Sequence, residues 1–167
     1  MALPPRVVVV SRPGELDELV ARHGTLQQAE FFLASRGEDL TLARERQRHL
    51  DAALLAVQSN VPLSWRRARV LRHELERFLF EPEDLVVAVG QDGLVANVAK
   101  YLDGQRVIGV NPDPSAYDGV LASHPAEAAR DLLPVAVNGR AKVEARTMVE
   151  ARLDDGQRLH RLDAHRH

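Results

Sequence analysis

One segment, from residue 85 to residue 111, restricts the fold of this chain more than any other. It begins with the apolar run LVVAV at residues 85–89, which has the length and composition of a buried strand. The turn Gly-Gln-Asp-Gly at residues 90–93 leads into residues 94–102, where apolar side chains recur at helical spacing. A second apolar run follows at residues 106–110. This order predicts two parallel strands joined by a helix in a right-handed crossover.

The rest of the N-terminal part continues the alternation of strands and helices. The β-branched run at residues 6–10 predicts another buried strand. Residues 15–60 are rich in helix formers and are interrupted twice by glycine, which predicts three helices. A short strand is expected near residues 69–70, a helix around residues 74–79, and a further helix from Pro125 onward. The sequence therefore predicts an α/β fold built on a parallel sheet.

The sequence pattern changes after Gly139. Apolar and polar residues alternate strictly over residues 143–153, which is typical of a strand with one apolar face. An Asp-Gly pair at positions 155–156 indicates a hairpin turn, and the apolar residues within 159–162 indicate a returning strand. A β-hairpin is therefore expected over residues 143–162.

Composition excludes several classes of protein. The 167 residues are 45% hydrophobic, which is enough for one domain with a buried core. Lys+Arg (22) nearly balance Asp+Glu (24), so nucleic acid is not an expected partner. The absence of cysteine excludes disulfides and thiolate metal sites, and no metal site is predicted. No apolar run approaches the roughly 20 residues of a membrane helix, and the N-terminus lacks a signal-peptide core, so we expect a cytoplasmic protein without membrane contact.

Loops that follow predicted strands form the candidate site. The carboxyl ends of parallel strands share one edge of a sheet, so the loops at residues 11–14, 90–93 and 111–113 are expected to meet where such sheets bind ligands. The turn at 90–93 leads into a helix, whose free N–H groups and dipole favour an anion such as phosphate. Gly90 and Gly93 allow that phosphate to approach the backbone.

Asp92 is the candidate reactive group at this edge. A carboxylate beside phosphate repels it, unless the carboxylate accepts a proton from a hydroxyl nucleophile or holds a metal ion. Alternatively, Asp92 caps the helix that follows it. For Asn111, which precedes Pro112, the alternative to a site role is that of an ordinary turn residue. The spacing of the residues leaves these alternatives open.

The string VVAVGQDGLVANVAKYL, followed by RVIGVNPDP, resembles the nucleotide-binding half of the ATP-NAD kinase family. In that family a strand, a Gly-Gly-Asp-Gly-Thr turn and a helix precede a strand that ends in Gly-x-Asn. The later string VEARTMVEARLDDGQRL resembles the family's passage into a second, β-rich domain. The resemblance implies a Rossmann-like domain of the phosphofructokinase-related type over residues 1–139, and the start of an incomplete β-rich domain over residues 140–167.

The resemblance also implies an activity. It is phosphoryl transfer from ATP or polyphosphate, with Mg²⁺ on the nucleotide, to the adenosine ribose 2′-hydroxyl of NAD, giving NADP. Asp92 would remove the hydroxyl proton. Gly90 and Gly93 would face phosphates, and Asn97 and Asn111 would contact the nucleotide.

The sequence departs from this family at several positions. Gln91 and Leu94 replace the second glycine and the threonine of the turn, and the family's Asn-Glu pair would lie beyond residue 167. A catalytically inactive or truncated nucleotide-binding or interaction module of the same fold is therefore a second hypothesis. A lipid-kinase relative is a third, because that group shares the Gly-Gly-Asp-Gly turn. The strand end at residues 107–111 favours the NAD kinase family over the lipid kinases.

The predicted hairpin has an apolar face that little of the remaining chain can cover. The residues of this face are Val143, Ala145, Val149, Ala151 and Leu153. An isolated hairpin is marginally stable in water, and an open apolar sheet face favours association. The hairpin could pack on the α/β domain, pair with the same segment of a second copy, or stay partly disordered. We expect pairing into a homo-oligomer, or disorder.

Overall fold

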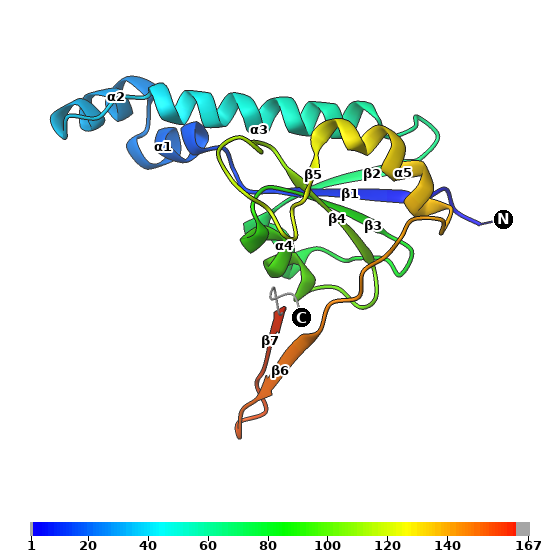
Figure 1. Ribbon diagram of the computed structural model, residues 1–167. Helices are drawn as coiled ribbons and strands as arrows, with labels where there is room; N and C mark the ends of the chain where they lie inside the picture. Colours follow the sequence, from blue (N-terminus) through cyan, green and yellow to red (C-terminus); the bar gives the residue numbers. More distant parts are fainter. Residues whose placement is uncertain (1, 163–167) are drawn as a thin grey trace.

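The computed structural model describes residues 2–162 and has one open parallel sheet at its centre (Figure 1). Its strands are β1 (Arg6–Ser11), β2 (Arg66–Leu71), β3 (Leu85–Val89), β4 (Arg106–Asn111) and β5 (His124–Pro125). All are parallel, in the order β2-β1-β3-β4-β5. The predicted Rossmann-like α/β sheet is confirmed at this level. The strand order reverses between β1 and β3, and sheets of this kind bind ligands at the carboxyl ends of those strands.

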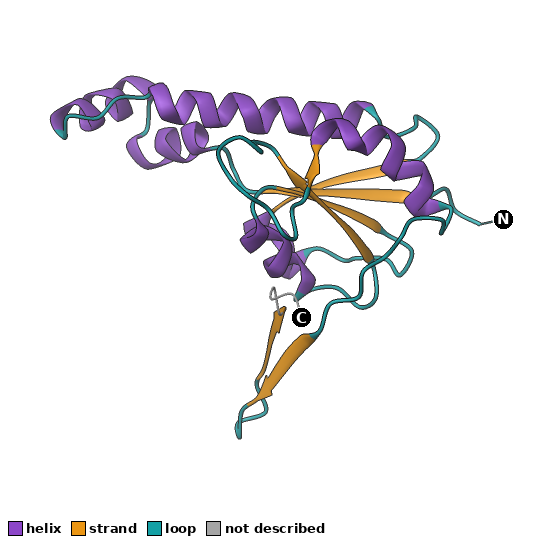
Figure 2. Cartoon of the chain, viewed as in Figure 1, coloured by secondary structure: helices purple, strands orange, loops and turns teal. Residues whose placement is uncertain are grey.

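Helices cover both faces of the sheet. One face carries α3 (Thr41–Ser59) and α5 (Ala129–Val137), and the other carries α4 (Asp92–Ala99) (Figure 2). Along β1, Val7 and Val9 pack in the layer with α3 and α5, whereas Val8 and Val10 pack in the layer with α4. Because β1 is buried on both faces, neither face needs polar side chains, which explains its unbroken run of valines.

The remaining helices agree with the sequence prediction except in two details. The three helices expected before residue 60 are α1 (Glu15–His23), α2 (Leu26–Ser35) and α3. The helix expected around residues 74–79 is the short 3₁₀ helix η1 (Arg72–Arg77), and α5 is preceded by a 3₁₀ turn, η2 (Ala126–Ala128), rather than beginning at Pro125. Within residues 2–162, every helix is too short or too polar to cross a bilayer.

The C-terminal part forms an antiparallel hairpin, β6 (Met148–Arg152) and β7 (Arg158–Leu162), outside the main sheet. The prediction of a strand over residues 143–153 is wrong in its first half, because residues 143–147 belong to no strand. Alternation alone does not make a strand. The backbone N–H and C=O groups need a partner, and β7 within the described residues pairs only as far as Met148.

The hairpin projects from the α/β body beside α4 (Figure 1). Leu162 at the end of β7 is buried, and β7 contacts α4. Val149 and Leu159, on the other face of the hairpin, are 58% and 59% exposed. This apolar face is therefore uncovered within the described residues. The division of the chain into domains at residues 139 and 140 stays a prediction.

The loop between β4 and β5 packs unusually close to the sheet. A Cβ atom on Gly109 would lie 2.1 Å from the carbonyl oxygen of Leu121, and one on Gly119 would lie 2.0 Å from that of Ala122. Real Cβ atoms do not approach backbone oxygens this closely. The loop reaches this position only because neither residue has a side chain.

We expect Gly109→Ala to destabilise the protein by about 1–3 kcal/mol, because the new methyl group must displace backbone rather than a flexible side chain. Gly93→Ala is the matched control, since a Cβ there meets nothing within 4 Å. It should be neutral or stabilising by about 0.4–1 kcal/mol. Urea unfolding followed by circular dichroism measures both. Equal stabilities for the two variants would contradict the close packing of the loop.

Candidate functional site

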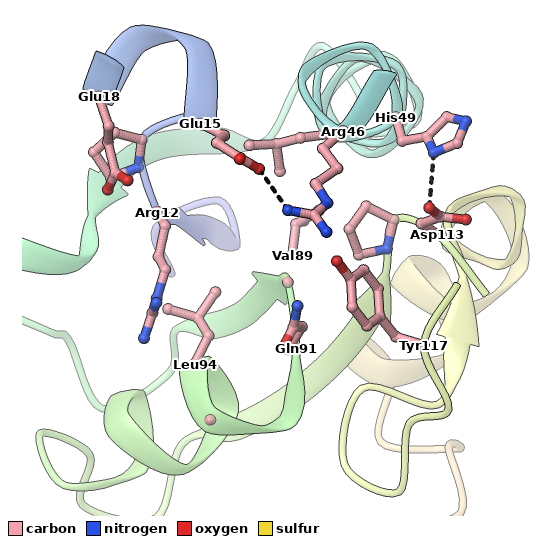
Figure 3. A pocket seen from close by; sticks show the side chains of 15 residues that line it. Arg12, Glu15, Glu18, Arg46, His49, Val89, Gln91, Leu94, Asp113 and Tyr117 are labelled. Atoms are coloured by element: carbon pink, nitrogen blue, oxygen red, sulfur yellow. Dashed lines mark hydrogen bonds and ion pairs between the residues drawn. The ribbon is translucent and has the colours of Figure 1, made fainter. Parts of the chain in front are cut away.

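A cavity of about 490 Å³ opens at the carboxyl ends of β1, β3 and β4 (Figure 3). Its wall comes from five parts of the chain, namely Arg12 after β1, Glu15 and Glu18 on α1, Arg46 and His49 on α3, the turn at residues 90–93 after β3, and Tyr117 in the loop after β4. The three loops that the sequence places at one edge of the sheet all contribute to it. The cavity thus lies where the strand order reverses, the usual position of a ligand in such a sheet.

The charges in this cavity are mostly paired. Arg46 donates from Nη1 to Oε2 of Glu15 at 3.0 Å, and this hydrogen bond raises the pKa of Arg46 (Figure 3). His49 Nδ1 lies 2.9 Å from Oδ2 of Asp113, at an angle unsuited to a hydrogen bond, so the contact is an ion pair when the ring is protonated. Arg12 is exposed and makes no ion pair or hydrogen bond with any side chain of residues 2–162. Arg12 is therefore the cation available to a ligand.

The turn at residues 90–93 supplies backbone donors to the same cavity. The N–H of Gly90 donates to the carbonyl of Val110 at 2.9 Å, which ties the turn to β4. The next amides belong to the first turn of α4, where N–H groups have no partner within the helix. Gly90 and Gly93, the two predicted phosphate-facing residues, both line the cavity, and the space beside the Gly93 Cα is open. The turn is thus accessible to an anion.

Asp92 directs its carboxylate away from this cavity and onto the loop after β4. Oδ1 accepts N–H bonds from Leu121 at 2.9 Å and Ala122 at 2.8 Å, and Oδ2 accepts one from Val120 at 3.0 Å. Burial raises the pKa of Asp92, but these three bonds outweigh it and hold the pKa below its usual value. The carboxylate makes no capping bond within its own helix. As placed, it is a weakened base, and each of its oxygens already accepts at least one hydrogen bond.

Asn111 fixes the same loop from the end of β4. Its buried amide donates from Nδ2 to the carbonyl of Tyr117 at 2.8 Å, and its Oδ1 accepts from the N–H of Asp113 at 3.0 Å. The second bond is the local turn that an asparagine typically makes two residues on. Asn111 and Asp92 together therefore hold the segment that carries Tyr117 into the cavity wall. We call this segment, residues 112–122, the clamped loop.

Asn97 lies in a different cavity from the other predicted residues. This second cavity, of about 330 Å³, is lined by Asn97 of α4, by Tyr101 just after that helix, and by Arg72 and His73 of η1. Arg12, Pro13 and Glu18 line both cavities, so the two cavities adjoin at the start of α1. The predicted roles of Asp92, Asn97 and the glycines in binding or catalysis stay predictions.

Sequence reasoning missed the contribution of α3. Arg46 and His49 are three positions apart, so they lie on one side of the helix, and this spacing was the only available signal. Nothing in the sequence indicates that this side faces the ends of β3 and β4. Tyr117 was missed as well, because it lies in a loop without regular pattern.

Neither the comparisons nor the donor groups identify a ligand. The sequence matches no model of a known protein family and no curated protein. Within residues 2–162, no group of three His, Cys, Asp or Glu side chains converges as metal ligands, and His165 and His167 lie outside the described residues. A Mg²⁺ ion that arrives on a nucleotide needs only one or two carboxylates, and Glu18 at the cavity wall fits that requirement.

The bonding of Asp92 predicts a pH-dependent stability. Because its folded pKa is depressed, the ionised group stabilises the fold above its unfolded value, near pH 3.9, and this contribution disappears as the pH falls through the folded pKa. We expect Asp92→Asn to cost about 1.5–3 kcal/mol at pH 7, the range for a hydrogen-bonded charge. The difference between wild type and variant should shrink below about pH 4, which urea unfolding at several pH values measures.

Asp131→Asn is the control for this experiment. Asp131 also lies in the first turn of a helix, is exposed, and makes no hydrogen bond or ion pair within residues 2–162. Its removal should cost less than about 1 kcal/mol, the usual contribution of a charge near a helix start. If the two variants behave alike at pH 7, Asp92 does not stabilise the loop.

Proposed function

We propose that this chain is a nucleotide-binding module that binds a nucleotide without transferring its phosphate. The observation that carries the proposal is the composition of the main cavity. It combines the guanidinium of Arg12, which has no side-chain partner within residues 2–162, with helix-start amides at residues 91–93, the ring of Tyr117, and the carboxylates of Glu15 and Glu18. These are the donor, stacking and acceptor groups that phosphate, base and ribose hydroxyls require.

The size and position of the cavity support the same proposal. Ligand pockets usually measure about 300–1,000 Å³, and this one lies at the reversal point of a parallel sheet. A phosphate at the start of α4 would lie against the open side of Gly93, within the reach of the Arg12 side chain. A nucleotide ligand also fits the cytoplasmic location that the sequence predicts.

The bonding of Asp92 favours binding over catalysis. A general base needs a free lone pair near the hydroxyl that it deprotonates, and a pKa close to the working pH. The Asp92 oxygens instead accept three backbone N–H bonds, which lower its pKa and face it toward the clamped loop. Proton abstraction by Asp92 would have to proceed from a carboxylate whose basicity these bonds lower.

A phosphotransferase of the NAD kinase type is the second candidate. The turn at residues 90–93 and the Asn111 strand end support it, since both lie at the ligand-binding edge of the sheet. In that reaction the oxygen of the ribose 2′-hydroxyl would bond to the terminal phosphorus of the donor. The carboxylate of Asp92 would take the proton that this hydroxyl loses. The leaving group, ADP or the shortened polyphosphate, would take the electrons of the broken P–O bond. ATP with Mg²⁺, or polyphosphate, would be the donor, and NAD the acceptor.

Removing the guanidinium of Arg12 tests the binding proposal. We expect Arg12→Ala to weaken the binding of ATP or NAD by about 10- to 150-fold, the equivalent of one charged hydrogen bond of about 1.5–3 kcal/mol. Arg48→Ala is the matched control, because Arg48 is exposed on α3 and lines neither cavity. Isothermal titration calorimetry with each nucleotide measures both. Equal affinities for the two variants would place the phosphate elsewhere.

An assay for NADP formation separates the two candidates. The binding module predicts nucleotide affinity without turnover by the wild-type chain. Turnover that Asp92→Asn abolishes, while circular dichroism shows an intact fold, would establish the phosphotransferase instead. Binding of neither ATP nor NAD would overturn both proposals.

A further inference from the structure

The hairpin leaves one edge of β6 open. Leu153 donates its N–H to the carbonyl of Gln157 at 2.9 Å, which fixes the direction of the groups along the strand. In an antiparallel ladder this direction alternates, so Val149 and Ala151 also point their N–H and C=O groups toward β7. Glu150 and Arg152 therefore point theirs outward. Within residues 2–162, β7 is the only strand that pairs with β6.

The side chains of β6 divide into an apolar and a charged face. Val149, Ala151 and Leu153 lie on one face by alternation, and Glu150 and Arg152 lie on the other. Every residue of β6 is exposed. An exposed, unpaired strand edge with an apolar face is a template for another strand, and a hairpin of two strands gains stability when a third is added.

We propose that β6 pairs antiparallel with β6 of a second copy of this chain, about a twofold axis at Ala151, to form a four-stranded sheet. The order of strands across this sheet is β7-β6-β6-β7. The hairpin projects away from the sheet and from helices α3 and α5, so its open edge is accessible to a second copy (Figure 1). The proposal is independent of the nucleotide cavity.

The charges of β6 select the register. The twofold axis must pass through a residue. An axis between two residues would place a residue whose backbone N–H and C=O face the second copy opposite one whose groups face β7. An axis at Glu150 places two glutamates opposite each other, and an axis at Val149 places Glu150 opposite Met148. An axis at Ala151 places Glu150 opposite Arg152 twice and Val149 opposite Leu153 twice. Opposite charges and apolar residues facing each other stabilise a sheet, and facing like charges destabilise it.

The same axis satisfies the backbone. With Ala151 opposite Ala151, the outward N–H and C=O groups of Glu150 meet those of Arg152 in the second copy and form a hydrogen-bonded pair. Within one chain Arg152 already forms an ion pair with Glu150, so both side chains lie on the same face and close together. Pairing of two copies would bring four such charges into one alternating network.

Charge reversal tests this register. We expect the wild type to have the mass of two chains by size-exclusion chromatography with light scattering. In Glu150→Arg, the new arginine lies opposite Arg152 of the second copy. In Arg152→Glu, the new glutamate lies opposite Glu150 of the second copy. Like charges repel in both cases, so each variant should have the mass of one chain. An equimolar mixture of the two variants restores opposite charges at both contacts and should return to two chains. Each variant lacks the ion pair within its own chain, so this recovery can arise only between chains.

A cysteine at the axis gives a second, independent readout. The chain has no cysteine, so Ala151→Cys introduces a single thiol. Facing residues of a non-hydrogen-bonded pair have Cα atoms about 4.5 Å apart, within the range for a disulfide. Mild oxidation should therefore give a disulfide-linked dimer. Leu159→Cys is the exposed control on β7, where the two thiols would be three strand spacings, about 14 Å, apart and should remain free.

Either experiment can overturn the proposal. A wild-type mass of one chain would do so, as would a dimer that survives both single charge reversals. Disulfide formation through Leu159→Cys in preference to Ala151→Cys would show that the copies associate through another surface.

Discussion

The burial of β1 and β3 on both faces is the constraint on which the rest of this structure depends. Parallel strands need crossover connections, and right-handed crossovers on the two sides of β1 and β3 place α3 over one face and α4 over the other. The same reversal leaves space between the carboxyl ends of these strands, where the main cavity lies. At the opposite edge, Arg6 binds the buried carboxylate of Asp84 at 2.7 and 2.5 Å and ties the start of β1 to the start of β3.

The polar residues at the strand ends illustrate why structure and function are difficult to separate in a sequence. Asp92 and Asn111 follow strands at the ligand-binding edge, which is where catalytic residues of such sheets occur. Both instead hold the clamped loop, which Gly109 allows to pack directly on β4. A short polar side chain at a strand end serves either purpose, and only the direction of the side chain distinguishes them. Arg12 and Tyr117 line the cavity that results.

The hairpin and the cavity are separate parts of the molecule. The cavity lies between α3 and the carboxyl ends of the strands, while the hairpin lies on the side of α4 (Figure 1). The proposed ligand binding and the proposed pairing of two copies would therefore use different surfaces. The hairpin has an apolar face and a charged face on one short strand, so the proposed association would be governed by register rather than by the size of the contact.

The sequence by itself determined the secondary structure of the core. Strands β1, β3 and β4, helix α4 and the hairpin turn were predictable, because burial and hydrogen bonding within an element depend on neighbouring residues and leave a local period in the sequence. Only the tertiary structure decided which residues of different elements contact each other. Asp92 meets its partners 28 to 30 positions away, α3 brings Arg46 to the strand ends, and β6 begins at Met148, which pairs with the last described residue of β7. Contacts of this kind join residues with no common period, so no local pattern records them.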